Sequence, residues 1–147
     1  MPPETTIVNL DYQAATKAQA ALNGVAAITD AEKRKKATDT MDTVATNALG
    51  VLQEMGVYSC CLFLLSRRQD SHKEHARALL RQLIALLGEL PFIDRAQSPL
   101  PNTSNAQATL TYVTTHVTAE LDHVLLTRQV YEQMLLYVRF GAAALKS

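Results

Sequence analysis

Apolar residues recur at spacings of three or four along most of the chain, and this period constrains the fold more than any other feature. It places one apolar side chain per turn on the same face of an α-helix, whereas a half-buried strand would alternate. Glycine and proline, five of each in 147 residues, are rare and localised. The sequence therefore predicts an all-α fold: a compact bundle of five to six helices, forming a single domain over residues 1–147.

Two helices are predicted before Gly56, the first over residues 10–28. The second follows a capping-box spacing from Thr29 to Glu32, in which each side chain can satisfy the other's free backbone N–H. Gly56 can supply the left-handed residue that often ends a helix. The apolar run of residues 57–65 then predicts a short third helix, with a strand as the alternative. The core-facing positions expected on the second helix are Ala37, Met41, Val44, Ala48, Leu52 and Met55.

A second capping-box spacing, Ser71 to Glu74, predicts the start of a fourth helix that must end before Pro91. Residues 91–105 contain three prolines and are expected to form the one long loop. The helical period then continues to residue 145, which is too long for one ordinary helix, and the β-branched residues at 114–118 predict a break. The inner positions expected on the fourth helix are Ala76, Leu79, Leu80, Leu83, Leu86, Leu87 and Leu90.

Targeting and membrane signals are not expected in this sequence. Its first residues do not combine a positively charged segment with a following apolar stretch, which argues against a secretory signal. The longest apolar run, residues 57–65, is far shorter than the roughly 20 residues of a membrane span. Cys60 and Cys61 are adjacent within that run, so we expect small core residues and no disulfide. These features predict a cytoplasmic protein with no membrane partner.

Histidines are the first candidates for chemistry. His116, Glu120 and His123 fall at i, i+4 and i+7, and Glu120 with His123 has the spacing used by di-iron bundles. Those bundles need a second such pair, which this sequence lacks, so we interpret the three as the polar flank of an amphipathic helix, with a metal-dependent enzyme as the alternative. His72 and His75 are expected to be solvated near a helix start. No common catalytic or phosphate-binding motif occurs, so no catalytic residue, cofactor or metal is expected.

The charges carry more information than the histidines. Lys and Arg total 14 and Asp and Glu total 14, and a net charge of zero by itself argues against a nucleic-acid binder. Residues 33–81, however, contain nine of the 14 cations and only five acids. The middle third is therefore locally basic. The nine cations are Lys33, Arg34, Lys35, Lys36, Arg67, Arg68, Lys73, Arg77 and Arg81.

Lys73, Arg77 and Arg81 are spaced by four, so they form a stripe on the side of the fourth helix opposite its leucines. Arg67 and Arg68 lie one short loop away, at the end of the third helix. Cations gathered in this way can contact phosphates without reading bases, which gives salt-dependent binding. The alternative is a solvated charged face.

The cations at 33–36 lie in the first two turns of the second helix, where they meet the positive end of the helix dipole. Helix stability therefore does not call for them, and phosphate contact is one interpretation. The other is a solvated face with helical ion pairs such as Lys35 with Asp39. Asp39 and Asp42 lie on this lysine-rich face, so we expect them to pair with lysine and not to act as acid or base.

The C-terminal helix carries one mainly apolar face, for which core packing is the default. Arg139 lies among these apolar and aromatic residues, either as a surface cation with its stem packed down or as a contact residue. The face consists of Tyr131, Leu135, Val138, Ala142 and Leu145.

Three segments together carry a family resemblance. They are the basic helix start at 33–36, the segment Met-Gly-Val-Tyr-Ser-Cys-Cys-Leu-Phe-Leu-Leu-Ser-Arg at 55–67, and the segment Leu-Tyr-Val-Arg-Phe-Gly-Ala-Ala at 136–143. In this order they resemble the small all-helical subunit of type III-B CRISPR effector complexes, the Cmr module. The chain departs from the family at Leu136, where Trp is usual, and at Val138, where Lys is usual.

The resemblance implies a non-catalytic subunit of an antiviral ribonucleoprotein complex. Its copies would stack head to tail beside the backbone and large subunits and help hold target RNA along the guide RNA. The family's basic positions correspond to Lys36, Arg67 and Arg139. The type III-A small subunit is the closest alternative, and a stand-alone helical module that docks a protein through the C-terminal helix is another. We expect RNA contacts from Lys33, Arg34, Lys36, Arg67, Arg68, Lys73, Arg77, Arg81 and Arg139.

Overall fold

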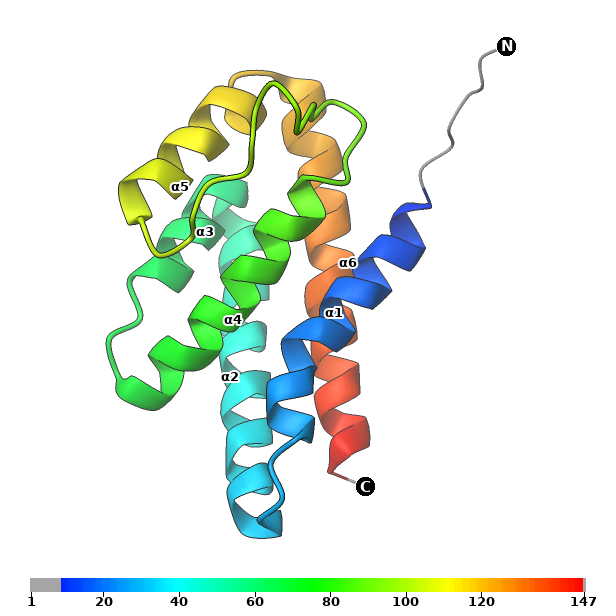
Figure 1. Ribbon diagram of the computed structural model, residues 1–147, viewed down its shortest axis with the longest axis vertical. Coiled ribbons are helices and arrows are strands. Elements are labelled where there is room, and N and C mark those ends of the chain that lie inside the picture. The colour runs from blue at the N-terminus through cyan, green and yellow to red at the C-terminus, as the bar shows by residue number, and fades with distance from the viewer. Residues whose placement is uncertain (1–8, 147) are drawn as a thin grey trace.

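The computed structural model describes residues 9–146, and within them the fold is all-α without strands (Figure 1). The expectation about a secretory signal falls on residues 1–8, which lie outside the described part. None of the described helices is both long and apolar enough to cross a membrane. The elements are α1 (Leu10–Ala26), α2 (Ala31–Met55), α3 (Val57–Leu65), α4 (Asp70–Leu87), α5 (Ala106–Val113), the π-helical segment η1 (Thr114–Thr118) and α6 (Leu121–Leu145).

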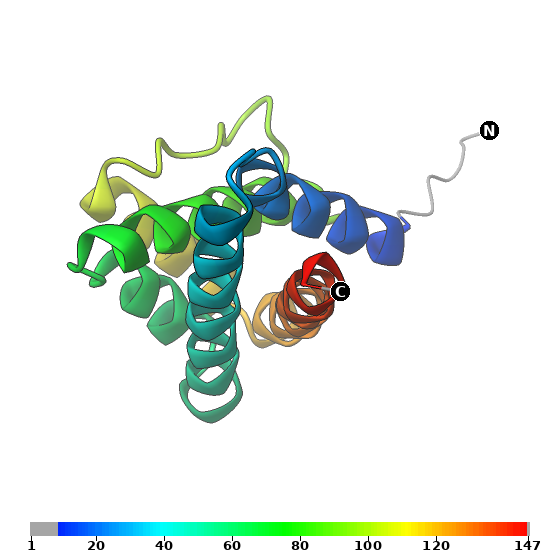
Figure 2. The same ribbon diagram turned by 90° about the horizontal axis from the view of Figure 1, so that it is seen from below.

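Helices α1 and α2 form the middle of the bundle. They diverge from their connection, and α6 lies in the angle between them (Figure 2). Helix α6 makes its most extensive contacts with these two helices, and α4 packs on α1, α2 and α3 while touching α6 only slightly. Helix α5 and η1 pack on α3. This order leaves the outer side of α4 free of any other helix.

The buried residues form one apolar core to which every helix contributes. The seven inner positions predicted for the fourth helix are at most 1% exposed; six lie on α4, and Leu90 lies just beyond its end. Each such leucine contributes on the order of 2 kcal/mol by leaving water. Met55 is an error of the sequence analysis, since it is 70% exposed. The helical period places it in line with Leu52, but α2 ends there and its last turn extends beyond the core.

Both predicted capping boxes are wrong in detail. Helix α2 is capped by Asp30, whose carboxylate accepts hydrogen bonds from the backbone N–H groups of Glu32 (3.0 Å) and Lys33 (3.2 Å). A carboxylate is favoured over a hydroxyl here because it also meets the positive end of the helix dipole. Helix α4 begins at Asp70 after Gln69, which makes no side-chain cap, so the helix already includes residue 71.

The chain does break between α5 and α6, but its sharp turn lies just after the predicted stretch 114–118. Residues 114–118 stay helical as the wider η1 turn, and the direction changes at Ala119 and the extended Glu120 (φ −133°, ψ 133°). Threonine hydroxyls bind backbone carbonyls in this stretch, from Thr114 to Thr111 (2.9 Å) and from Thr118 to Thr114 (3.3 Å). Such bonds compete with the helical ladder and bend it without ending it.

Residues 91–105 form the long loop that the sequence predicts, and this loop runs back beside α4 (Figure 1). Leu100 packs so closely over Gly88 that a Cβ there would lie 2.8 Å from its Cδ1, so glycine permits the approach. The Tyr112 hydroxyl donates a hydrogen bond to the Ser98 carbonyl (2.8 Å). The loop is thus fastened to both α4 and α5.

Helix α3 confirms the helical interpretation of the 57–65 run over the strand. Cys60 and Cys61 are free and completely buried, as expected of core residues. Burial raises the pKa of the Cys61 thiol to about 12, and it also raises the pKa of Cys60. Both thiols therefore stay protonated and unreactive at neutral pH.

Gly56 is the single residue between α2 and α3, and its backbone has φ 104° and ψ −172°. Positive φ confirms the expectation at this position, and the extended ψ puts the residue in a region that only glycine adopts readily.

We expect Gly56→Ala to lower the free energy of unfolding by about 1–3 kcal/mol in urea titrations. Gly50→Ala is the matched control, because this helical glycine has open space around it; it should gain about 0.5–1 kcal/mol. Equal effects of the two substitutions would contradict the role of the backbone angle.

Candidate nucleic-acid interface

The predicted stripe on α4 borders a surface groove. Lys73, Arg77 and Arg81 form one wall, and the loop residues Thr103 and Ser104 form the other, around a volume of about 280 Å³. Lys73 and Arg81 are exposed. Neither makes an ion pair with a described side chain. The groove therefore offers two exposed cations beside loop hydroxyls, an arrangement that suits the phosphates of a single strand.

Arg77 has a different role from its neighbours on the stripe. Its Nη1 donates a hydrogen bond to the Thr103 carbonyl (3.2 Å), 26 residues along the chain. Its Nε is buried without a partner among the described residues. Arg77 therefore holds the loop wall of the groove against α4, and only the rest of its guanidinium is available to a ligand.

A second groove on the inner side of α4 includes Glu74, His75 and Arg81 among its lining residues, together with residues of α1. The sequence places His75 among solvated residues, but it is partly buried. Burial lowers the pKa of His75, with the nearby Glu74 carboxylate opposing this effect. The imidazole is therefore mostly neutral at pH 7 and adds little positive charge to this face.

Arg67 and Arg68 differ in how firmly they are held. The Arg67 guanidinium lies over the Phe63 ring, 4.2 Å from its centroid, which is cation–π geometry. This contact fixes the side chain at the end of α3, next to the start of α4. Arg68 is exposed, so it can reach a ligand without giving up a described contact.

The basic cluster at the start of α2 is also divided. Arg34 donates from Nη1 to the Ile28 carbonyl (3.0 Å), so it closes the connection between α1 and α2. Lys33 and Lys36 are exposed and make no ion pair with any described side chain. These two lysines remain available for phosphate contact, as does Lys35, which is also exposed.

Arg139 is engaged in an ion pair inside the protein. Its Nε lies 3.8 Å from the Asp42 carboxylate, and Lys146 lies 2.8 Å from Asp39 and 3.6 Å from Asp42. The two aspartates do pair with lysine, but the lysine is Lys146, just after α6, and the predicted pair of Lys35 with Asp39 is not among the ion pairs of the described residues. The pairs connect α2 to the C-terminal end of α6.

The apolar face predicted on the C-terminal helix belongs to the core. Tyr131, Leu135, Val138 and Ala142 are completely buried, whereas Leu145 is exposed at the last turn. Helices α1 and α2 cover this face, so it is not open to a partner. Phe140 is the most exposed large apolar side chain in this half of the helix, at 66%.

The predicted His116, Glu120 and His123 face does not form one continuous helix, because the turn at Glu120 separates the first histidine from the second. His123 donates a hydrogen bond from Nδ1 to the His116 carbonyl (3.0 Å). Its ring stacks on the Phe92 ring, with the two centroids 3.8 Å apart. Its Nε2 lies 3.8 Å from the Glu120 carboxylate. Among the described residues no group of three or more His, Cys, Asp or Glu side chains is placed to hold a metal.

Sequence reasoning missed the contribution of the loop. Thr103 and Ser104 complete the groove although neither belongs to a charged cluster or to a periodic apolar face in the sequence. The only signal was the need for a 15-residue loop to pack somewhere, since long loops without secondary structure are often functional.

Comparisons of the chain with protein-family models, with curated proteins and with solved structures found no match.

The pair of Asp39 with Lys146 generates a pH prediction. The hydrogen bond from Lys146 lowers the pKa of Asp39 from its ordinary 3.8, and it raises the pKa of Lys146 from 10.5. The ion pair should therefore stabilise the fold at pH values between the pKa of Asp39 and the pKa of Lys146. Its contribution is lost as the pH falls through the lowered pKa of Asp39 or rises through the raised pKa of Lys146.

An NMR titration of the Asp39 carboxyl carbon should report a pKa below 3.8. The Lys146→Met variant should return that pKa toward 3.8, while Lys33→Met, on the same helix as Asp39, should leave it unchanged. An unchanged pKa in Lys146→Met would remove this pair from the account of how α6 is held.

Proposed function

We propose that this protein is a non-catalytic small subunit of a type III-B CRISPR effector complex, and that it helps hold target RNA along the guide. The observation that carries the proposal is the groove on α4, where Lys73 and Arg81 are exposed and make no ion pair with the side chains that the structure describes. The three segments resembling the family and the all-α bundle support the same function. A type III-A complex is the alternative assembly, with the same role for the groove.

The proposed contacts are to the sugar–phosphate backbone. Lysine binds phosphate as a point charge, and arginine adds a planar fork of donors. Single-stranded nucleic acid is commonly held by a positively charged groove that follows the backbone. Contacts of this kind do not depend on base identity, which suits a subunit that must accept any target the guide selects.

The cations divide by availability. Lys33, Lys36, Arg68, Lys73 and Arg81 are exposed, and we assign phosphate contact to them first. Arg34, Arg77 and Arg139 each hold two parts of the fold together, and we assign them to positioning. The zero net charge implies weak binding by the isolated chain. The proposal therefore places most of the RNA affinity in the assembled complex.

The groove can be tested through the salt dependence of RNA binding. Lys73→Gln combined with Arg81→Gln should reduce the slope of log affinity against log salt by about 1.4, because each phosphate contact to a single strand contributes about 0.7. The measurement is fluorescence anisotropy of a labelled oligouridylate with the full chain.

The matched control is Lys17→Gln combined with Arg95→Gln, which removes the same charge from two cations that pair with Glu89. The control should keep the wild-type slope. A zero slope for the wild-type chain, or the same loss in both double variants, would overturn the phosphate-binding groove.

The cations after α3 give a prediction for the assembled complex. Reversing Arg67 and Arg68 to Glu should lower target-RNA retention, because two phosphate contacts become repulsions. Retention is measured by filter binding at low salt with the reconstituted complex. The Phe63→Leu variant removes only the ring under Arg67 and should retain nearly all of the RNA. Unchanged retention in the double reversal would exclude these two residues from the interface.

A further inference from the structure

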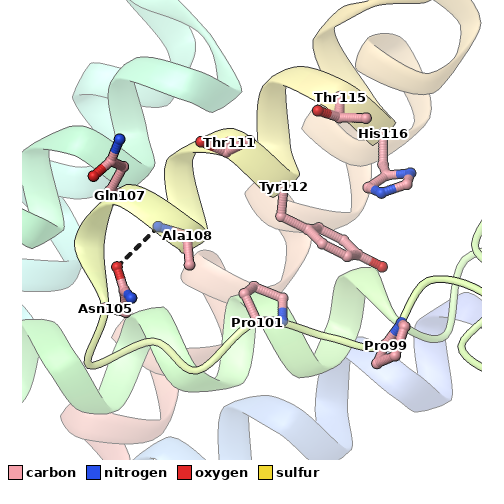
Figure 3. A pocket seen from close by; sticks show the side chains of 9 residues that line it. All are labelled: Pro99, Pro101, Asn105, Gln107, Ala108, Thr111, Tyr112, Thr115 and His116. Atoms are coloured by element: carbon pink, nitrogen blue, oxygen red, sulfur yellow. Dashed lines mark hydrogen bonds between the residues drawn. The ribbon is translucent and has the colours of Figure 1, made fainter.

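A separate cavity lies on the other side of the 91–105 loop, whose residues Thr103 and Ser104 form one wall of the basic groove. It has a volume of about 530 Å³ and opens between that loop and the α5–η1 segment. Figure 3 shows Pro99 and Pro101 on the loop, with Tyr112 and His116 turned toward them from the helix.

The aromatic side of the cavity is held in place before any ligand arrives. The Tyr112 hydroxyl is tied to the Ser98 carbonyl (2.8 Å), so the ring cannot swing out of position without breaking this bond. The His116 ring packs against it, with centroids 4.3 Å apart and the planes tilted by 46°. His116 is only partly buried. Tyr112 is buried, at 8% exposed, so the ring surface that the cavity presents to solvent is that of His116, held against Tyr112 at low cost in side-chain entropy.

The rim of the cavity is polar but carries no Asp, Glu, Lys or Arg among its lining residues. Thr111, Thr115 and Gln107 are exposed and supply hydroxyl and amide groups that can both donate and accept hydrogen bonds. The flat His116 ring and the neutral polar groups around it match a planar, uncharged heterocycle. A phosphate or a carboxylate would find no cation here.

The cavity and the basic groove share one short stretch of chain. Pro101 lines the cavity and Thr103 lines the groove. Two residues of chain span at most about 7 Å. Arg77 holds Thr103 against α4, and Tyr112 holds Ser98 against α5, so the loop between the two sites is fixed from both sides. A strand with phosphates in the groove can therefore place one base beyond the loop.

We propose that the cavity lined by Pro99, Pro101, Tyr112 and His116 binds one unpaired nucleobase of an RNA strand whose phosphates lie in the α4 groove. This inference rests on the proposed RNA-binding function and adds to it a base-stacking site. Stacking accepts every base because each has a π face, so the site would add affinity without sequence readout.

The test compares two labelled ligands of equal length on the full chain, oligouridylate and an abasic oligoribose phosphate. His116→Ala should weaken oligouridylate binding about fivefold or more, the lower limit for loss of one stacked base. It should leave the affinity for the abasic strand unchanged. Thr118→Ala is the control, because this exposed η1 residue does not line the cavity, and it should behave as the wild type.

A second variant protects the test against misfolding. Ala108→Leu adds bulk inside the cavity while keeping a good helix former, and its helix content is checked by circular dichroism. It should reproduce the selective loss seen with His116→Ala. Equal affinity of both folded variants and the wild type for oligouridylate, or equal weakening on both ligands, would overturn the base site.

The base site and the groove fail in distinguishable ways. If the groove variants lower the salt slope but the cavity variants have no effect, the base site is wrong and the proposed function stands. If the cavity variants act selectively while the groove variants do not, the phosphate path is wrong. Absence of any binding to either strand by the wild-type chain would overturn both.

Discussion

The burial of one face of α6 against α1 and α2 is the contact on which the rest of the structure depends. Tyr131, Leu135 and Val138 are completely buried there, and removing such side chains from water is the main favourable term in folding. Because α6 covers one side of the α1 and α2 pair, α4 covers the other, and its leucines complete the core. The polar side of α4 then faces outward, which is where the basic groove lies.

The basic residues serve two purposes that their sequence pattern does not separate. Three arginines join segments far apart in the chain: Arg34 to the α1–α2 connection, Arg77 to the long loop and Arg139 to α2. Arginine suits this task because its fork of donors can bond to the protein and still face solvent. The exposed lysines and Arg68 and Arg81 carry the charge that we assign to RNA.

Helix positions were predictable because they depend on local signals, as the leucines of α4 and the glycine at position 56 illustrate. Cap residues were not, since Thr29 and Asp30 both suit the role and the choice depends on the path of the chain into α2. The stripe of α4 was also predictable, from its spacing of four. Its partner wall at Thr103 was not, because no local rule says where a long loop packs.

The sequence by itself determined the all-α architecture, the apolar faces and the basic middle third, because each follows from residues within a few turns of one another. Only the tertiary structure decided which cations are free. Arg77 meets a carbonyl 26 residues away, and Asp42 meets Arg139 on another helix. Such contacts depend on how helices pack, and packing brings together side chains whose positions in the sequence are unrelated. The groove and the neighbouring cavity exist for the same reason.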